Sequence, residues 1–463
     1  MNSFSTNPAN PPNPYILSDE PTHLFTPYHF FWGVISRILN IHVFWLFPFI
    51  AGTNILLFVA GIRVFCRNIL RDEKYALALA LTMLFFWIMP WGWSGFYNFG
   101  LLPLTAIYPY WFALPVSLFV IAGYGESNID GKWYGRFILN ILYGLAVCYI
   151  FLSHPLTGSF LILSLGIKVL LIRSIPTSNR LVLLTIPLLG IALALLWPYF
   201  PVLSTILGAG SFVTLGFAGN WELFYDKTAW RILPALFGLP FLLYSLIKLK
   251  FTYVPVALVV TASIYFFNYF VLHNSTLARY VIFIAFLCQV GVVLSLKHLE
   301  KRALYNYTVS GFLLVTLILA LPQFYRSACQ LGPVSDIVNG RSIGTHSNVA
   351  AFRQYSALRP YIGNTDVLMA PMRHSWELAG VIGCRVVGVL HSNPFMSDYF
   401  ERQLATKKFF TKGVAVADRS HILSHYAVSH VLIPKTYEAI VYDFTAYLTL
   451  VFEDKEYTLY TSE

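Results

Sequence analysis

Two neighbouring carboxylates near the start of the chain, Asp19 and Glu20, could act as a general base. A carboxylate held beside a hydroxyl group can take its proton and so activate the oxygen as a nucleophile. The pair stands shortly before an apolar stretch that begins at His29, which predicts a position at the level of a membrane surface. The alternative is a solvated turn at the end of a tail.

A second pair of carboxylates, Glu222 and Asp226, lies in a long connection later in the chain. Lys227 and Arg231 follow closely, so a local ion pair is favoured over catalysis or contact with a substrate. Before the C-terminal part, these four are the acidic side chains in connections on the face where the chemistry is expected. A general base on that face is one of them, comes from the C-terminal part, or is absent from this chain.

Arg279 is the cation that could bind a phosphate group. It lies in the sequence HNSTLARYVIF at the mouth of an apolar segment, with His273 six residues before it. An arginine there could hold the phosphate of a lipid-linked donor through charge-assisted hydrogen bonds, or it could reach ordinary lipid headgroups. His154, in the short turn SHPLTG, could donate to a phosphate or transfer a proton, or it could only cap the turn.

Aromatic side chains crowd the ends of several apolar segments on the same face. A belt of Trp and Tyr is common at membrane interfaces, whereas a sugar or an isoprenoid chain could also stack on such rings. Tyr97 and Tyr108 are the candidates for substrate contact. The crowded set comprises Trp87, Trp91, Trp93, Phe96, Tyr97, Tyr108, Tyr110 and Trp111.

The elements that must position these residues are predicted to be transmembrane helices. Hydrophobic residues make up 57% of the 463 residues and charged residues 11%, which leaves too few polar side chains to cover a soluble domain. None of the 21 acidic residues falls in the middle of an apolar run, as expected where an unpaired charge in hydrocarbon is costly. A span needs about 20 apolar residues. That template predicts an α-helical polytopic domain of nine or ten helices, at 43–65, 75–93, 101–123, 137–152, 156–172, 181–203, 232–247, 254–272, 280–296 and 309–322.

The positive residues predict the orientation of these helices. Every second connection carries Lys or Arg and the others are nearly free of them, which places the cation-bearing connections in the cytoplasm of a multi-pass plasma (inner) membrane protein. The net charge of +10 therefore comes from loops rather than from a basic face with interleaved aromatics, so no nucleic-acid partner is expected. The cations are Arg63, Arg67, Arg71, Lys74, Lys132, Arg136, Lys168, Arg173, Arg180, Lys248, Lys250, Lys297, Lys301 and Arg302.

Residues 1–26 are predicted to be a disordered extracytoplasmic tail. The first residues are rich in Asn, Pro and Ser and have no signal-peptide pattern to carry them across a membrane, which suggests that something upstream is missing. The multi-span domain is then 27–326. At its start, residues 29–39 read HFFWGVISRIL and predict a helix lying in the membrane interface on the outer side.

Residues 327–463 are predicted to form a small extracytoplasmic α/β domain. Short β-branched runs alternate with helical stretches, which indicates a small parallel sheet, and a hairpin is expected at the end of the chain. The strands are expected at 366–370, 384–389 and 430–433, the hairpin at 448–461, and the helices at 375–381 and 418–426.

Histidines and cysteines in this domain could suggest a metal or a disulfide. His421 and His425 have helical spacing, but no HExxH pattern or third ligand accompanies them, so no metal site is predicted. Cys329 and Cys384 could form a disulfide in an oxidising compartment or could both be free thiols.

The order of these parts, together with several short motifs, resembles the GT-C superfamily of polyprenyl-phosphate-dependent membrane glycosyltransferases. The motifs are ARY before a late span, HPLTG between two middle spans, and DVLMAP, SWELAGVIGCRVVG and HYAVSHVLIP in the C-terminal domain. The last three motifs resemble the C-terminal domain that is common in bacterial relatives of the dolichyl-phosphate-mannose protein mannosyltransferases. The resemblance implies a lipid-linked sugar as co-substrate, Arg279 as a ligand of its phosphate, and His154 on the same face. The family normally has a further span and an acidic outer loop first, so the comparison with the family implies that the first transmembrane helix is lacking here.

Two functions are therefore expected. The first is inverting transfer of a sugar from a polyprenyl-phosphate donor to an acceptor at the outer face, with Asp19 or Glu20 as the base. The second is a non-catalytic membrane scaffold or lipid-binding subunit of cell-envelope polysaccharide assembly, favoured by the missing span and the few outer carboxylates. Membrane lipids and the lipid-linked donor are the expected partners, and no pattern indicates the sugar, the acceptor or the oligomeric state.

Overall fold

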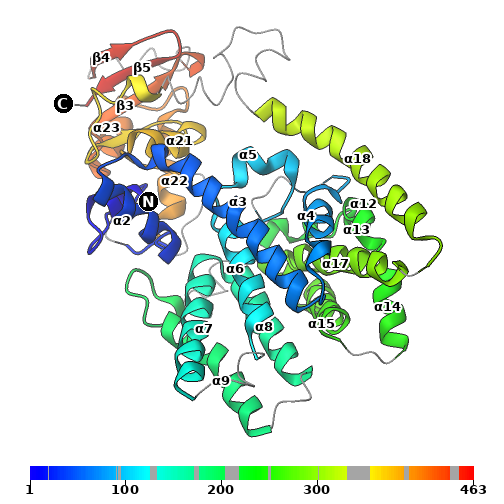
Figure 1. Cartoon of the computed structure of the whole chain (residues 1–463). Coiled ribbons are helices and arrows are strands. Elements are labelled where there is room, and N and C mark those ends of the chain that lie inside the picture. The colour runs from blue at the N-terminus through cyan, green and yellow to red at the C-terminus, as the bar shows by residue number, and fades with distance from the viewer. Residues whose placement is uncertain are drawn as a thin grey trace. The chain divides into compact units, whose positions relative to one another are not determined.

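The computed structural model divides the chain into two compact units, which are described separately. One unit is Trp45–Leu331, and the other combines Met1–Phe44 with Gly332–Glu463. Figure 1 shows the helices of the first and the sheet of the second. The structure describes residues 1–18, 20–89, 91, 95–125, 133–171, 177–203, 218–248, 252–300, 302–330, 355–389, 396–437 and 448–462.

The first unit is helical in its described part. Every one of the ten predicted spans overlaps a helix, because runs of apolar residues without interior charges satisfy the backbone internally and bury their side chains in lipid or against each other. The α-helices are α3 (Val43–Asn68), α4 (Ala76–Phe85), α5 (Leu102–Thr105), α6 (Pro109–Gly123), α7 (Trp133–Ser153), α8 (Pro155–Leu171), α9 (Thr177–Ala194), α12 (Thr228–Arg231), α13 (Leu233–Leu236), α14 (Leu239–Ile247), α15 (Tyr253–Phe267), α16 (Ser275–Ala278), α17 (Val281–Leu299) and α18 (Tyr305–Gln330). Shorter turns are η1 (Glu73–Tyr75), η2 (Phe99–Leu101), η4 (Ala218–Phe224) and the π-helix η5 (Asn268–Leu272).

Several of these helices are long and apolar enough to cross a membrane. In the described part of the chain, four qualify by length and composition: Val43–Asn68, Tyr253–Leu272, Ser275–Leu299 and Tyr305–Gln330. A fifth candidate consists of Phe99–Thr105 and Pro109–Gly123, which are bent by 111°. Shorter apolar helices include Phe137–Ser153, Pro155–Leu171 and Asn179–Ala194, and α7, α8 and α9 lie side by side (Figure 1). The chain is a multi-pass membrane protein.

The helix α17 is the centre of this unit. Of the most apolar window of Ser275–Leu299, which contains α17, 78% is buried, compared with 17% for α18. Phe283 of α17 stacks on Phe160 of α8, with ring centroids 4.1 Å apart and an interplanar angle of 5°. Contacts of this kind bring the start of α17 to the start of α8, which are far apart in the sequence.

The helix α4 is shorter than its predicted span 75–93. It ends at Phe85, and Phe86 has a non-helical ψ of 57°. The indole Nε1 of Trp87 donates to the carbonyl of Met83 at 2.8 Å, so the side chain takes the acceptor that the Trp87 backbone amide would use in a helix. The carbonyl of Phe85 accepts from Nε2 of Gln323 on α18 at 2.9 Å. The tertiary contact therefore stabilises the helix end.

The second unit contains the predicted α/β domain. Its sheet has the order β2-β1-β3-β5-β4, in which β1 pairs in parallel with β2 and β3, and β5 pairs antiparallel with β3 and β4. The elements are β1 (Val367–Met369), α21 (Met372–Ile382), β2 (Arg385–Val386), α22 (Tyr399–Phe409), α23 (Val416–His425), β3 (His430–Pro434), η6 (Lys435–Tyr437), β4 (Thr449–Glu453) and β5 (Tyr457–Thr461). The predicted strands, both predicted helices and the terminal hairpin are confirmed.

The N-terminal residues belong to this same unit. Residues 1–26 were expected to be disordered, but they instead include the short helix α1 (Asn2–Thr6), in which Phe4 is fully buried against Phe25 and Phe30. The carbonyl of Tyr15 accepts a hydrogen bond from the backbone amide of Val386 in β2, at 2.6 Å. Aromatic burial and this backbone pairing give the segment its order, and neither is visible in its polar composition. The helix α2 (Pro27–Leu39) matches the predicted helix 29–39, and its position in an interface stays a prediction.

All five cysteines are free thiols in the described structure. Cys384 is fully buried in the α/β domain, and burial raises the pKa of its thiol to about 12. Of the two alternatives for Cys329 and Cys384, the structure has the free thiols.

Candidate functional site

Arg279 caps the C-terminal end of the short helix α16, and an asparagine caps its start. The side chain of Asn274 accepts from the backbone amides of Thr276 and Leu277 at 2.8 and 3.1 Å, which is the role of an N-cap. Asn274 is held in turn by Asn268, whose Nδ2 donates to its carbonyl at 3.0 Å and whose Oδ1 accepts from its amide at 2.9 Å. These hydrogen bonds between the two asparagines determine where α16 starts and hence where Arg279 lies.

The turn that carries His154 lies beside Arg279. Tyr280, the residue after Arg279, donates from its hydroxyl to Ser159 of α8 at 2.8 Å. This bond ties the start of α17 to the first turns of α8, where His154 precedes the helix. Burial and, secondarily, the positive charge of Arg279 lower the pKa of His154 to about 4. At neutral pH the imidazole is therefore uncharged.

The hydrogen bonds of His154 determine which nitrogen carries its proton. Nδ1 accepts from the backbone amide of Thr157 at 3.3 Å and lies 2.8 Å from the Thr157 hydroxyl. A neutral imidazole that accepts at Nδ1 carries its hydrogen on Nε2. His154 can thus donate one hydrogen bond next to a permanent guanidinium charge. An arginine and a neutral N–H donor together suit a phosphate or another anion.

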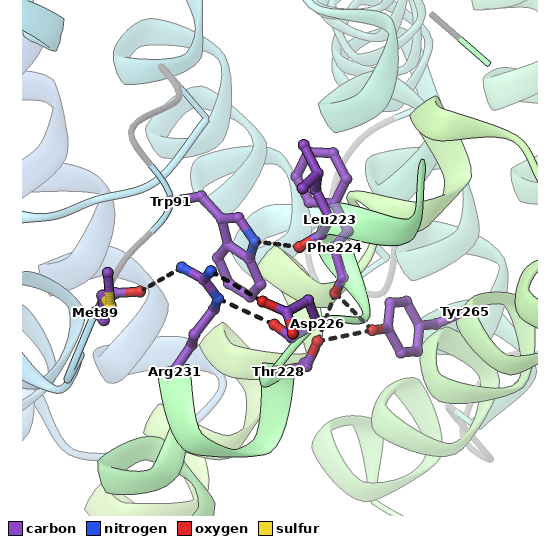
Figure 2. Close-up of polar contacts among 8 residues, drawn as sticks. All are labelled: Met89, Trp91, Leu223, Phe224, Asp226, Thr228, Arg231 and Tyr265. Atoms are coloured by element: carbon purple, nitrogen blue, oxygen red, sulfur yellow. Dashed lines mark hydrogen bonds and ion pairs between the residues drawn. The ribbon is translucent and has the colours of Figure 1, made fainter. Parts of the chain in front are cut away.

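The surface beneath Arg279 is aromatic. Its guanidinium lies 5.5 Å from the ring centroid of Phe224, the last residue of η4, and Phe224 is fully buried. The carbonyl of Phe224 accepts from the hydroxyl of Thr228 at 2.5 Å and from that of Tyr265 at 2.9 Å. These bonds fix η4 on α12 and α15 and so hold the ring in place (Figure 2).

Asp226 forms the predicted local ion pair. Its carboxylate lies 3.6 Å from Nη2 of Arg231, and its carbonyl accepts from Nε of the same side chain at 3.1 Å (Figure 2). Glu222 is exposed on η4, and its backbone carbonyl accepts from the amides of Tyr225 and Asp226. Contact of either carboxylate with a substrate stays a prediction.

His273 lies on the face formed by η4 and η5. It is exposed, with a left-handed φ of 53°, and its ring centroid is 4.6 Å from that of Trp221. Trp221 also contacts Tyr225 and Tyr269 edge-on, at 5.5 and 5.9 Å. The structure thus brings His273 to the same element, η4, whose other end lies under Arg279.

The two candidate tyrosines occupy different environments. Tyr97 is 2% exposed, packs against Phe58 and Trp111 at centroid distances of 4.7 and 4.3 Å, and donates to the carbonyl of Tyr110 at 3.3 Å. These contacts place Tyr97 in the core rather than on a binding surface. Tyr108 is 45% exposed at the N-terminal end of α6. Tyr110, which was not a candidate, lies 5.3 Å from the His154 ring.

Of the two predicted bases, Glu20 belongs to the unit that contains the α/β domain. Asp19 lies outside the described residues. Oε1 of Glu20 accepts from the backbone amide of Ser397 at 3.2 Å and from its hydroxyl at 2.6 Å. Its carboxylate therefore joins the N-terminal segment to the start of α22. Among the described residues, no group of three or more His, Cys, Asp or Glu side chains could hold a metal ion.

Similarity to known proteins is found by comparing structures and not by comparing sequences. No protein-family model matches this chain, and no curated protein does. ArnT from Cupriavidus metallidurans bound to undecaprenyl phosphate is similar with a TM-score of 0.53 and 13% identity over 100% of this chain and 92% of that one. The Archaeoglobus fulgidus oligosaccharyltransferase in its apo form gives 0.53 and 12% over 100% and 70%. The same organism's AglB, in complex with an inhibitory peptide and a dolichol-phosphate, gives 0.53 and 13% over 94% and 64%.

The chain has the GT-C fold. The resemblance inferred from short motifs is therefore confirmed at the level of the fold, including the helical membrane domain and the small sheet domain near the C-terminus. At identities of 12 to 13%, the likeness extends to the fold alone.

Within this GT-C fold, sequence reasoning missed the residues that support the site. Asn274 could have been found, because an asparagine before Ser-Thr is an N-cap signature. Thr157 follows His154 by three residues, which is also a local signal. Phe224 and Tyr110 carry no such signal, since they reach the site only through tertiary packing.

Proposed function

We propose that this protein is a membrane glycosyltransferase that moves a sugar from a polyprenyl-phosphate donor to an acceptor at the outer face of the membrane. The observation that carries the proposal is the hydrogen bond of Tyr280 to Ser159, which brings Arg279, at the start of α17, near the neutral His154, at the start of α8. Two neighbours of the same fold have been solved with undecaprenyl phosphate and dolichol-phosphate, which supports a lipid phosphate as the ligand.

The chemistry requires charge stabilisation on the leaving group. The acceptor oxygen forms a bond to the anomeric carbon of the sugar while the bond from that carbon to the phosphate oxygen breaks. The phosphate changes from a diester to a monoester and gains negative charge, which a fixed guanidinium stabilises more in the transition state than in the donor. Arg279 has this role in the proposal, and Nε2–H of His154 donates to the same phosphate.

The base and the sugar contacts complete the proposal. A carboxylate, Asp19 or Glu20, accepts the proton of the acceptor hydroxyl. Exposed groups near η4 and α6 contact the sugar or the acceptor, and they are His273, Tyr108, Glu222 and Asp226. The α/β domain lies outside the cell, as the alternation of cations in the connections predicts.

A non-catalytic lipid-binding or scaffold role is the second candidate. The observation that favours it is that the Glu20 carboxylate already accepts two hydrogen bonds from Ser397. A carboxylate oxygen that is occupied in joining two segments is less available to an acceptor hydroxyl.

Arg279→Ala tests the phosphate site directly. We expect the purified variant in detergent to bind undecaprenyl phosphate at least about tenfold more weakly than the wild type, because a charge-assisted contact is lost. Arg302→Ala is the matched control, since Arg302 is exposed at the other end of α17 and should leave the affinity unchanged. Wild-type affinity in Arg279→Ala would remove the proposed site.

Replacing the carboxylates separates the enzyme from the scaffold. For an enzyme, Asp19→Asn or Glu20→Gln should abolish new surface glycan in a complemented deletion strain while leaving undecaprenyl phosphate affinity intact. Full glycan production by both single variants and by the double variant would contradict the proposed base.

A further inference from the structure

Arg231 clamps the segment after α4 to the elements that carry Phe224. Its Nη1 donates to the carbonyl of Met89 at 3.2 Å, and its own carbonyl accepts from the backbone amide of Ile88 at 3.1 Å. Its Nε donates to the carbonyl of Asp226 at 3.1 Å. The side chain is 16% exposed and lies at the end of α12. One residue thus joins two stretches that are more than a hundred positions apart.

The same guanidinium lies on an aromatic ring that leads to Arg279. Its central carbon is 5.0 Å from the ring centroid of Trp91. Trp91 stacks on Phe224 with centroids 6.0 Å apart and an interplanar angle of 29°, and its Nε1 donates to the carbonyl of Leu223 at 2.8 Å. Phe224 in turn lies under the guanidinium of Arg279. The two arginines are therefore connected through a pair of aromatic rings, and Figure 2 shows the Arg231 end of this chain of contacts.

The geometry uses properties that only arginine has. Nε, Nη1 and Nη2 of Arg231 are directed toward the Asp226 carbonyl, the Met89 carbonyl and the Asp226 carboxylate, while the planar group lies over Trp91. A lysine ammonium can replace the charge, but it cannot reach these three acceptor groups and stack on the Trp91 ring at the same time. Because its donors are used in this way, Arg231 holds protein groups rather than a ligand.

We propose that Arg231 is a positioning residue for the donor phosphate. It fixes the Trp91–Phe224 pair on which Arg279 rests, and so sets the orientation of the Arg279 guanidinium toward the phosphate. This inference rests on the proposed function, in which Arg279 binds the donor. From the sequence alone, Arg231 was expected only to form a local ion pair, and the inference adds a role in positioning Arg279.

A double-mutant cycle on purified full-length protein in detergent tests this role, with undecaprenyl phosphate as the probe. We expect Arg231→Ala and Arg231→Lys each to raise the Kd about fivefold to tenfold. Combined with Arg279→Ala, Arg231→Ala should add no further loss, because it acts only through Arg279. Lys227→Asn is the matched control, since it removes a neighbouring exposed cation. The backbone of Lys227 has a left-handed φ of 52°, which asparagine tolerates. This variant should bind undecaprenyl phosphate like the wild type.

The possible results separate the two proposals. If Arg279→Ala weakens binding and Arg231→Lys binds like the wild type, or if the losses at 231 and 279 multiply, the positioning role is wrong and the phosphate site stands. If Arg279→Ala binds like the wild type, both proposals fail. Should Arg231→Ala not fold, the Kd of Phe224→Leu, in which Arg231 is unchanged, is measured instead. A raised Kd in that variant supports the chain of contacts, and an unchanged Kd refutes it.

Discussion

At the scale of single residues, the proposed phosphate site combines one permanent charge, on Arg279, with one neutral donor, on His154. The arginine supplies the permanent charge, and its field together with burial keeps the histidine neutral. Thr157 selects the tautomer by donating to Nδ1. A second cation at this point would cost more desolvation energy in the absence of a ligand than a neutral N–H does.

The lowered pKa of His154 predicts how stability depends on pH. The unfolded residue takes up a proton near pH 6.5, whereas the folded one does so near 4, so stability is complete above 6.5 and falls as the pH drops toward 4. The loss should reach up to about 3 kcal/mol. His154→Gln removes this titration. Melting temperatures of the ligand-free protein in detergent should therefore shift in favour of the variant between pH 7 and 4.5.

His273→Gln serves as the control for this measurement, because His273 is exposed. It should follow the wild type at every pH. A constant difference between the wild type and His154→Gln across the range would contradict burial of a neutral histidine at this turn.

At the scale of elements, the crossing of α17 with the start of α14 depends on two glycines. A Cβ added to Gly238 would lie 2.0 Å from the carbonyl oxygen of Cys288 and 2.4 Å from the amide nitrogen of Val292. A Cβ on Gly291 would lie 2.7 Å from the carbonyl oxygen of Gly238. Small residues let helix backbones approach closely in a membrane, where there is no hydrophobic drive between helices. This contact supports the central helix that begins just after Arg279.

Gly238→Ala should therefore destabilise the protein strongly. The backbones must separate to admit the methyl group, and we expect a loss of about 3 kcal/mol, seen as a lower melting temperature in detergent. Gly311→Ala on α18 is the matched control, because nothing lies within 4 Å of its added Cβ. That variant should change stability by about 1 kcal/mol or less. Equal melting temperatures for the two variants would show that the helices do not meet at Gly238.

At the scale of the whole molecule, the membrane orientation can be measured. Cys148 and Cys329 are the two cysteines that are not fully buried, so both are first replaced by Ser. In that background, Lys412→Cys in the α/β domain should react with a membrane-impermeant maleimide on right-side-out vesicles, since Lys412 is exposed. Arg302→Cys, after α17, should react only once the membrane is permeabilised. The reverse pattern would invert the predicted topology and place the Arg279 site on the cytoplasmic face.

Composition and periodicity by themselves determined the class of this protein and most of its elements. Long apolar runs without interior charges predicted helices in all ten positions, and β-branched runs predicted the strands of the small sheet, because both signals are local. The ion pair of Asp226 with Arg231 was also predictable from spacing. The tertiary structure alone decided the burial of Tyr97, the end of α4 at Phe85, the attachment of Glu20 to Ser397, and the ring of Phe224 under Arg279. Each of these depends on side chains brought together from distant parts of the chain, and no local pattern encodes which distant partner a side chain will contact.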